Sequence, residues 1–105
     1  MAYASDNGYV FDNKPVFRGG MNKESLSGNK TLDAKSETFH LLTLDQARDL
    51  ILPEHRDGLM YIIRPLAHTL TVKDSAGSTV TTVNAGIGIV IVSDGTEWFI
   101  VLAGA

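Results

Sequence analysis

Three histidines, His40, His55 and His68, are the residues of this sequence best suited to metal binding or acid–base chemistry. Paired histidine ligands usually stand close together, four residues apart on a helix or beside a cysteine ligand. The three histidines are widely separated, and the sequence contains no cysteine. We therefore expect each histidine to have a structural role, and we predict no metal site.

The remaining reactive residue types also lack a catalytic arrangement. Asp74 and Asp94 stand in glycine-containing segments, where aspartate usually accepts hydrogen bonds from backbone turns. No serine stands in a Gly-x-Ser-x-Gly elbow, and no glycine-rich phosphate loop leads into a helix. The sequence thus predicts no catalytic and no cofactor-binding residue, and we expect the protein not to be an enzyme.

Composition narrows the kind of partner that the chain would bind. Its 105 residues are enough for one small domain, and 44% of them are apolar, a normal globular share. The net charge is −3 with no basic block, which argues against nucleic acid as a partner. The longest apolar run, Ala85 to Val92, is too short to cross a membrane, and the N-terminus does not resemble a secretory signal. We expect a soluble product of the cytoplasm.

Residues 1–35 differ from the rest of the chain and are interpreted as an extended N-terminal arm. They are rich in the turn residues Gly, Asn, Ser and Asp, yet the first 17 residues hold half of the aromatic side chains. A simple linker does not need aromatic residues, whereas a segment that docks on a partner does. About 30 extended residues would reach roughly 100 Å.

Two arrangements of this arm remain open. It packs back on its own domain as edge strands, or it docks on another protein subunit, and we favour the second. The predicted partner-binding anchors are Tyr3, Tyr9, Phe11, Val16 and Phe17.

Residues 36–105 are predicted to form an all-β body, a small β-sandwich or jelly-roll-like barrel with one short helix. The helix is expected over residues 43–52, because Thr43 and Gln46 have capping-box spacing and Pro53 would end it. Turns are expected at 74–78, 84–86 and 93–96. The strand pattern begins at Lys30, ahead of this body, and the expected strands cover residues 31–34, 38–42, 59–64 (ended by Pro65), 66–73, 79–83, 87–92 (a buried central strand) and 97–102.

A body of this size is marginally stable alone, so we expect the chain to form a homo-oligomer, a dimer or a trimer. Trp98 and Phe99, in the last expected strand, are the predicted subunit-interface residues.

The segment from about residue 58 to 103 resembles bacteriophage virion structural proteins. The resemblance is carried by a strand, an Asp74-Ser-Ala-Gly turn, an Asn84-Ala-Gly turn, an apolar strand and the stretch Ser93-Asp-Gly-Thr-Glu-Trp98. Short capsid cement (decoration) proteins and segments of tail-fibre proteins share this pattern. The chain has no shaft repeat or coiled coil, which favours a cement protein.

This resemblance implies a protein of the virion, on the outer surface of the capsid, that is made in the host cytoplasm. It implies that the major capsid protein is the partner, and that binding only the assembled lattice stabilises the head. Two alternatives remain. A tail-fibre or receptor-binding tip would use Trp98 as a stacking platform for sugar, and a small cupin-like enzyme would bring the three histidines together around a metal.

Overall fold

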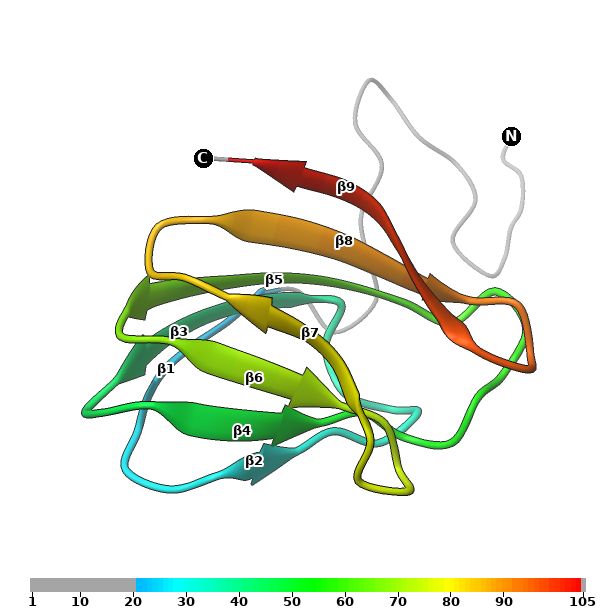
Figure 1. Cartoon of the computed structure of the whole chain (residues 1–105), viewed down its shortest axis with the longest axis horizontal. Helices are drawn as coiled ribbons and strands as arrows, with labels where there is room; N and C mark the ends of the chain where they lie inside the picture. The colour runs from blue at the N-terminus through cyan, green and yellow to red at the C-terminus, as the bar shows by residue number, and fades with distance from the viewer. Residues whose placement is uncertain (1–20, 105) are drawn as a thin grey trace, which may run out of the picture.

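A computed structural model describes residues 21–104, which contain nine strands and no helix (Figure 1). They form a five-stranded sheet of order β1-β3-β5-β8-β9 and a four-stranded sheet of order β2-β4-β6-β7. The all-β class is therefore confirmed. The strands are β1 (Met21–Leu26), β2 (Lys30–Thr31), β3 (Phe39–Leu44), β4 (Arg48–Ile51), β5 (Met60–Ala67), β6 (Leu70–Lys73), β7 (Thr79–Val83), β8 (Gly88–Ser93) and β9 (Trp98–Gly104).

Residues 1–20 and residue 105 lie outside the described part of the chain. The five predicted arm anchors, Tyr3, Tyr9, Phe11, Val16 and Phe17, all belong to that excluded segment. Residues 21–31, which the sequence assigns to the same arm, form β1 and β2 and pair with β3 and β4.

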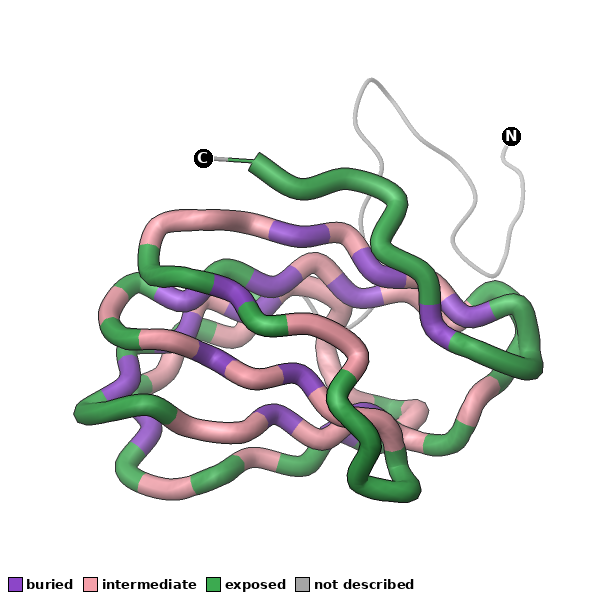
Figure 2. The backbone as a smooth tube through the Cα atoms, viewed as in Figure 1, coloured by how far each residue is buried: buried purple, intermediate pink, exposed green. Residues whose placement is uncertain are grey.

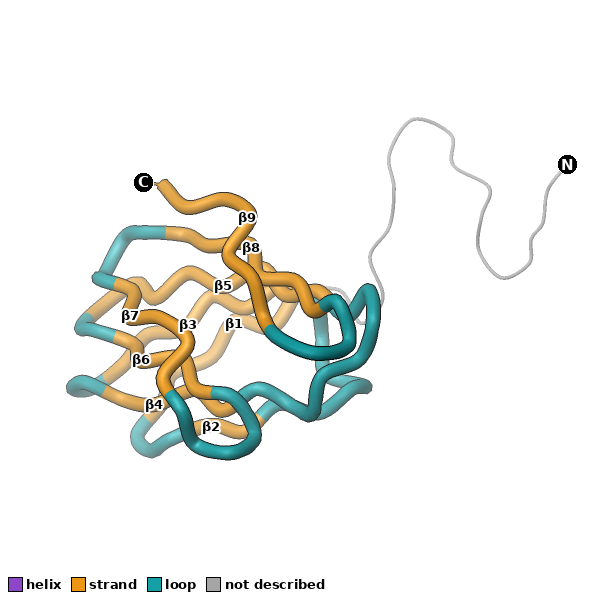
Figure 3. Tube along the Cα trace, turned by 45° about the vertical axis from the view of Figure 1, so that its right-hand side comes forward, coloured by secondary structure: helices purple, strands orange, loops and turns teal. Residues whose placement is uncertain are grey.

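The first six strands alternate between the two sheets, so the chain winds as a helical path of three turns. We call each turn, which contains one strand of each sheet, a coil: β1–β2, β3–β4 and β5–β6. In the five-stranded sheet β1, β3 and β5 are parallel neighbours, and in the four-stranded sheet β2, β4 and β6 are parallel neighbours. Figure 3 shows the loops that join the strands at the ends of the coils. Parallel pairing of this kind differs from the antiparallel strands of a jelly roll, so the jelly-roll topology is not confirmed.

The last three strands pair antiparallel with their neighbours and close the structure. β7 is antiparallel to β6, β8 is antiparallel to β5, and β9 is antiparallel to β8. The predicted turns are confirmed: the Asp74 carboxylate accepts hydrogen bonds from the N–H groups of Ala76 and Ser78, and the Asp94 carboxylate does so from Thr96 and Glu97. β8 lies between β5 and β9, as expected of a central strand.

The core lies between the two sheets and is built mostly from leucine and isoleucine. Buried and more exposed residues alternate along most of the strands (Figure 2). Leu42 and Ile63 of one sheet pack in one core with Leu50 and Val72 of the other, and none of the four has exposed surface. Tyr61 joins this core, and its hydroxyl donates a hydrogen bond of 2.7 Å to the carbonyl oxygen of Asp33.

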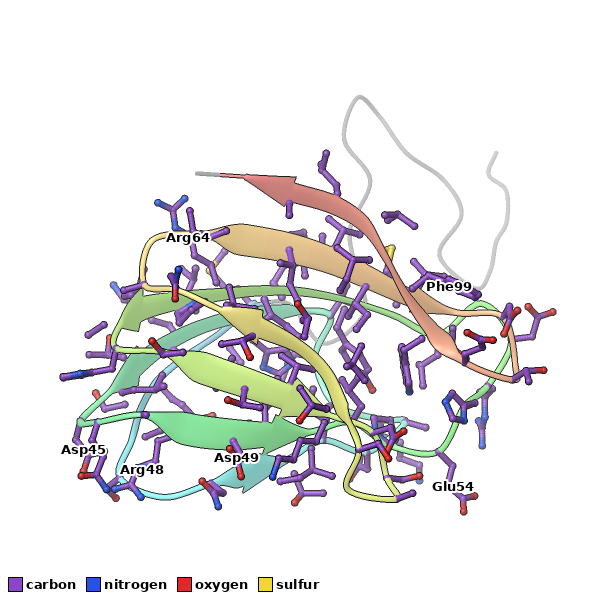
Figure 4. All side chains as sticks on the ribbon, viewed as in Figure 1. Asp45, Arg48, Asp49, Glu54, Arg64 and Phe99 are labelled. Carbon is purple, nitrogen blue, oxygen red and sulfur yellow. The ribbon has the colours of Figure 1, made fainter. Side chains whose placement is uncertain are left out.

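The helix predicted over residues 43–52 is absent, and a strand, a corner and a second strand take its place. Leu44, Leu50 and Leu52 are all buried, which follows the two-residue period of strands on either side of the corner. Figure 4 shows the side chains of Asp45 and Arg48 meeting at this corner, where two hydrogen bonds of 2.9 Å join them. A helix over residues 43–52 would interrupt the parallel pairing of β3 with β1 and remove that of β4 with β6. These pairings are the contacts that the neighbouring coils provide.

The single strand predicted over residues 66–73 is only partly correct, because the chain turns at His68 and divides it between β5 and β6. His68 has a positive φ of 65° and is exposed, while Leu70 and Val72 are buried. Pro65 does not end the preceding strand but lies within β5, next to a bulge in its pairing with β3. A bulge is one of the few places where a sheet accepts proline.

Candidate binding surface

His40 has the structural role that the sequence predicts. Its ring is buried, and its Nε2 lies 2.6 Å from the carbonyl oxygen of Glu37. The Asn22 amide nitrogen lies 3.3 Å from Nδ1. This pattern fits a neutral ring that donates from Nε2 and accepts at Nδ1. Burial lowers the pKa of His40, which favours the same neutral form.

The other two histidines lie apart from His40 and from each other in the fold. His55 is in the loop between β4 and β5, with its ring 6.0 Å from that of Trp98, and His68 is at the corner between β5 and β6. Within residues 21–104 no three side chains of His, Asp or Glu come together as a metal site would require. The convergence that a cupin-like site needs is therefore not found among these residues.

The feature that the sequence did not reveal is an apolar row on the outer surface of the five-stranded sheet. Met21 is paired with Phe39, Phe39 with Ile62, Ile62 with Val90, and Val90 with Leu102, so one residue from each strand stands in line. The inner neighbours on these strands, such as Ile63 and Ile89, are buried. The row residues are therefore on the face that points away from the core. We call this row and its flanking residues the apolar face.

The residues on one side of the row are also apolar, whereas a charged residue borders the row on the other side. Met60, Val92 and Phe99 form a second aligned set next to the row. On the opposite side Leu41 is aligned with Arg64, which carries a charge at the border. Figure 4 places Phe99 and Arg64 at opposite ends of the sheet.

Two shallow hollows lie on the apolar face and share Ile62 and Gly88. One, of about 320 Å³, is bounded by β5, β8 and β9, and the other, of about 200 Å³, by β1, β3 and β5. Gly88 leaves the space open because it has no side chain. A Cβ atom at this position would lie in ordinary contact with the Arg64 side chain and the Gly104 carbonyl oxygen. Such hollows suit apolar side chains of a partner protein rather than a polar substrate.

The two residues predicted for the subunit interface differ in position. Trp98 is buried, with its ring 6.0 Å from that of Tyr61, so it belongs to the core of its own chain. It is therefore not an exposed platform for sugar. Phe99 points the other way, is 44% exposed and borders the apolar face. Phe99 is thus the one of the pair whose side chain is accessible to a partner.

Comparisons with protein-family models, with curated protein sequences and with solved structures found no match to this chain. In the part that the structure describes, no helix has the length and apolar character needed to span a membrane.

Proposed function

We propose that this protein is a structural component of a bacteriophage particle. In this role it is a capsid cement protein that binds the assembled major capsid protein lattice and stabilises the head. The apolar face and the N-terminal arm make the contacts, and the protein acts without catalysis, metal or cofactor. It binds neither nucleic acid nor membrane.

The observation that carries this proposal is the apolar face itself. Isolated apolar residues are ordinary on protein surfaces, but an aligned row across all five strands of a sheet is not. Contiguous apolar surface of this kind marks a site of protein–protein contact. An open sheet face fits a broad protein surface, and Met21, the first described residue, is a member of the row.

The closing segment β7–β9 adds a second line of support. Together with β6 and the Asp74 turn that leads into β7, this segment contains the strands and turns on which the resemblance to virion proteins rests. These residues form a compact hairpin framework around the core rather than a site, as expected for a protein that works by adhesion. No residue role is transferred from the resemblance.

A second candidate, a tail-fibre module, is favoured by the three parallel coils. Coils that stack in parallel can be extended by further coils along one axis, as in repeat architectures that form elongated shafts. This arrangement supplies a repeat that is not visible in the sequence.

Binding to separated heads and tails distinguishes the two candidates. Fluorescently labelled full chain is mixed with purified heads, or purified tails, of a bacteriophage that encodes it, and the bound fraction is measured after sedimentation. A cement protein saturates heads at a fixed ratio to the major capsid protein and leaves tails unlabelled. Labelling of tails alone would support the fibre candidate, and labelling of neither would refute both.

A substitution pair tests whether the apolar face makes the contact. Val90→Lys puts a charge in the middle of the row, on a half-buried residue, and should weaken head binding at least tenfold. Thr82→Lys places the same charge on exposed β7 of the other sheet and should leave binding unchanged. Circular dichroism confirms that each variant is folded. Equal binding by both variants would show that the apolar face is not the contact surface.

A further inference from the structure

The described residues have four sheet edges, and two of them, β1 and β2, are built in ways that discourage pairing with another chain. An exposed edge strand offers unpaired N–H and C=O groups to any other strand, so soluble proteins shorten, charge or cover such edges. β2 has only two residues and β1 carries Lys23 and Glu24, whereas β7 is uncharged but polar at three of its five positions.

β9, the fourth edge, is the longest of the four, and its pairing with β8 contains one bulge, at Val101. Its seven residues contain no charge and no proline, and among the described residues it pairs with β8 alone. Its four large residues after Trp98 are exposed: Phe99 by 44%, Ile100 by 38%, Val101 by 59% and Leu102 by 67%. Figure 2 shows β9 as an almost continuous exposed segment, in contrast to β5 and β8 beside it.

The exposure of β9 on both of its faces has a structural cause. The four-stranded sheet ends at β7, whereas the five-stranded sheet continues past β8 to β9. In Figure 1 β9 projects beyond the other strands, so that it lacks a second layer beneath it. A partner must therefore supply both a strand for the free edge and apolar side chains on both faces.

We propose that a second copy of this chain is that partner, with the two β9 strands pairing antiparallel about a twofold axis. A strand about as long as β9, uncharged and apolar, would match both this edge and its exposed faces. Residues 1–20 contain Asp6, Asp12, Lys14 and Arg18, and no run without charge among them exceeds five residues. β8 is already paired on both sides, so β9 itself is the segment of the chain that meets these requirements.

Pairing of two β9 strands joins the two five-stranded sheets into one. Such an isologous contact uses the same residues on both copies and closes after two subunits, which prevents the open-ended edge association that leads to fibres. The apolar rows that end at Phe99 and Leu102 would then continue from one copy to the next. The dimer does not require the virion role, and a monomer that bound heads would leave that role intact.

Cysteine scanning tests this pairing directly, because the chain has no cysteine of its own. Single cysteines are placed at each of positions 99–103 in the full chain, and crosslinking is measured after mild oxidation. The residue nearest the twofold axis faces its own copy at about the distance that a disulfide needs. We expect one position to crosslink at least fivefold more than Ser25→Cys on β1 or Thr82→Cys on β7, with the yield falling on either side.

Sedimentation equilibrium supplies a second test in reversible conditions. Val101→Lys places like charges close together across the pairing and should raise the dimer dissociation constant at least tenfold, while Thr82→Lys leaves it unchanged. Serine replacements at Tyr9, Phe11 and Phe17 should not affect the dimer. A wild-type monomer at all concentrations, uniform crosslinking along β9, or dissociation by the arm replacements alone would overturn the proposal.

Discussion

The parallel coils of β1–β6 and the closing segment of β7–β9 share one core but are held together by different contacts. Each strand of the coils pairs with a strand one full coil away in the sequence, as β4 does with β6. The closing segment is instead joined by tight turns, one from β6 into β7 and one between β8 and β9. The coil edges are also short or charged, whereas the closing segment ends in an uncharged edge.

This difference indicates a division of roles. The coils place buried leucines in both sheets and so provide the stable scaffold. The closing segment completes the apolar face and supplies its one edge suited to pairing. Stability should therefore depend mainly on the coils, and association mainly on β9.

The largest expected effect comes from removing a core side chain of the coils. Leu50 has no exposed surface and lies between the two sheets, so Leu50→Ala should lower the free energy of unfolding by about 2–5 kcal/mol. Val101→Ala on the exposed edge should change it by less than about 0.5 kcal/mol in the monomer. Urea denaturation at low protein concentration measures both, and similar losses would contradict the division of roles.

Two turn glycines provide the next comparison. Gly95, in the hairpin of the closing segment, has a positive φ of 94°, so Gly95→Ala should destabilise the fold by about 1–2 kcal/mol. Gly28, at the corner between β1 and β2, lacks a positive φ and has open space around it. Gly28→Ala should therefore be neutral, or stabilising by up to about 1 kcal/mol. Thermal unfolding of the two variants would contradict this contrast if the losses were equal.

His40 should make the stability of the coils depend on pH. Burial lowers the pKa of His40 in the folded state, so the unfolded chain binds a proton more readily. Stability should fall as the pH drops from the unfolded value, about 6.5, through the lower folded value. Urea midpoints at pH 7.5 and 5.5 measure this change, and His40→Gln should make the difference between them smaller. An unchanged pH dependence in the variant would exclude His40 as its source.

The smallest effect concerns two aspartates, one in each region, whose pKa values are lowered for different reasons. Hydrogen bonding and ion pairing with Arg48 lower the pKa of Asp45, whereas the N–H groups of Glu97 and Thr96 lower that of Asp94. Each contributes stability above the ordinary pKa of about 4 that is lost as the pH falls through the folded value.

Salt should separate these two carboxylates. An ion pair on the surface is screened by salt, and a backbone hydrogen bond within a turn is screened less. NMR titration in 1 M NaCl should raise the pKa of Asp45 toward its ordinary value more than that of Asp94. Equal responses would indicate that the Arg48 contact does not set the Asp45 value.

The sequence by itself determined the local features of this protein. Two turns depend on contacts between residues that are close in sequence, one with Asp74 and Gly77 and the other with Asp94 and Gly95. These turns, and the presence of strands on either side of them, therefore follow from residue type alone. The unbroken apolar run Ile89–Val92 likewise predicts a central strand, and the structure places it between β5 and β9, although only the side of Ile89 and Ile91 is buried.

Only the tertiary structure decided how distant strands combine. The spacing of Leu44, Asp45 and Arg48 fits a helix and a coil corner equally well, and the ladders from β1 and β6 select the corner. The apolar face has the same origin, because Met21, Ile62 and Leu102 become neighbours of a single row through pairings that no local pattern encodes. Turn chemistry acts between adjacent residues, whereas strand order depends on side chains that meet only after folding.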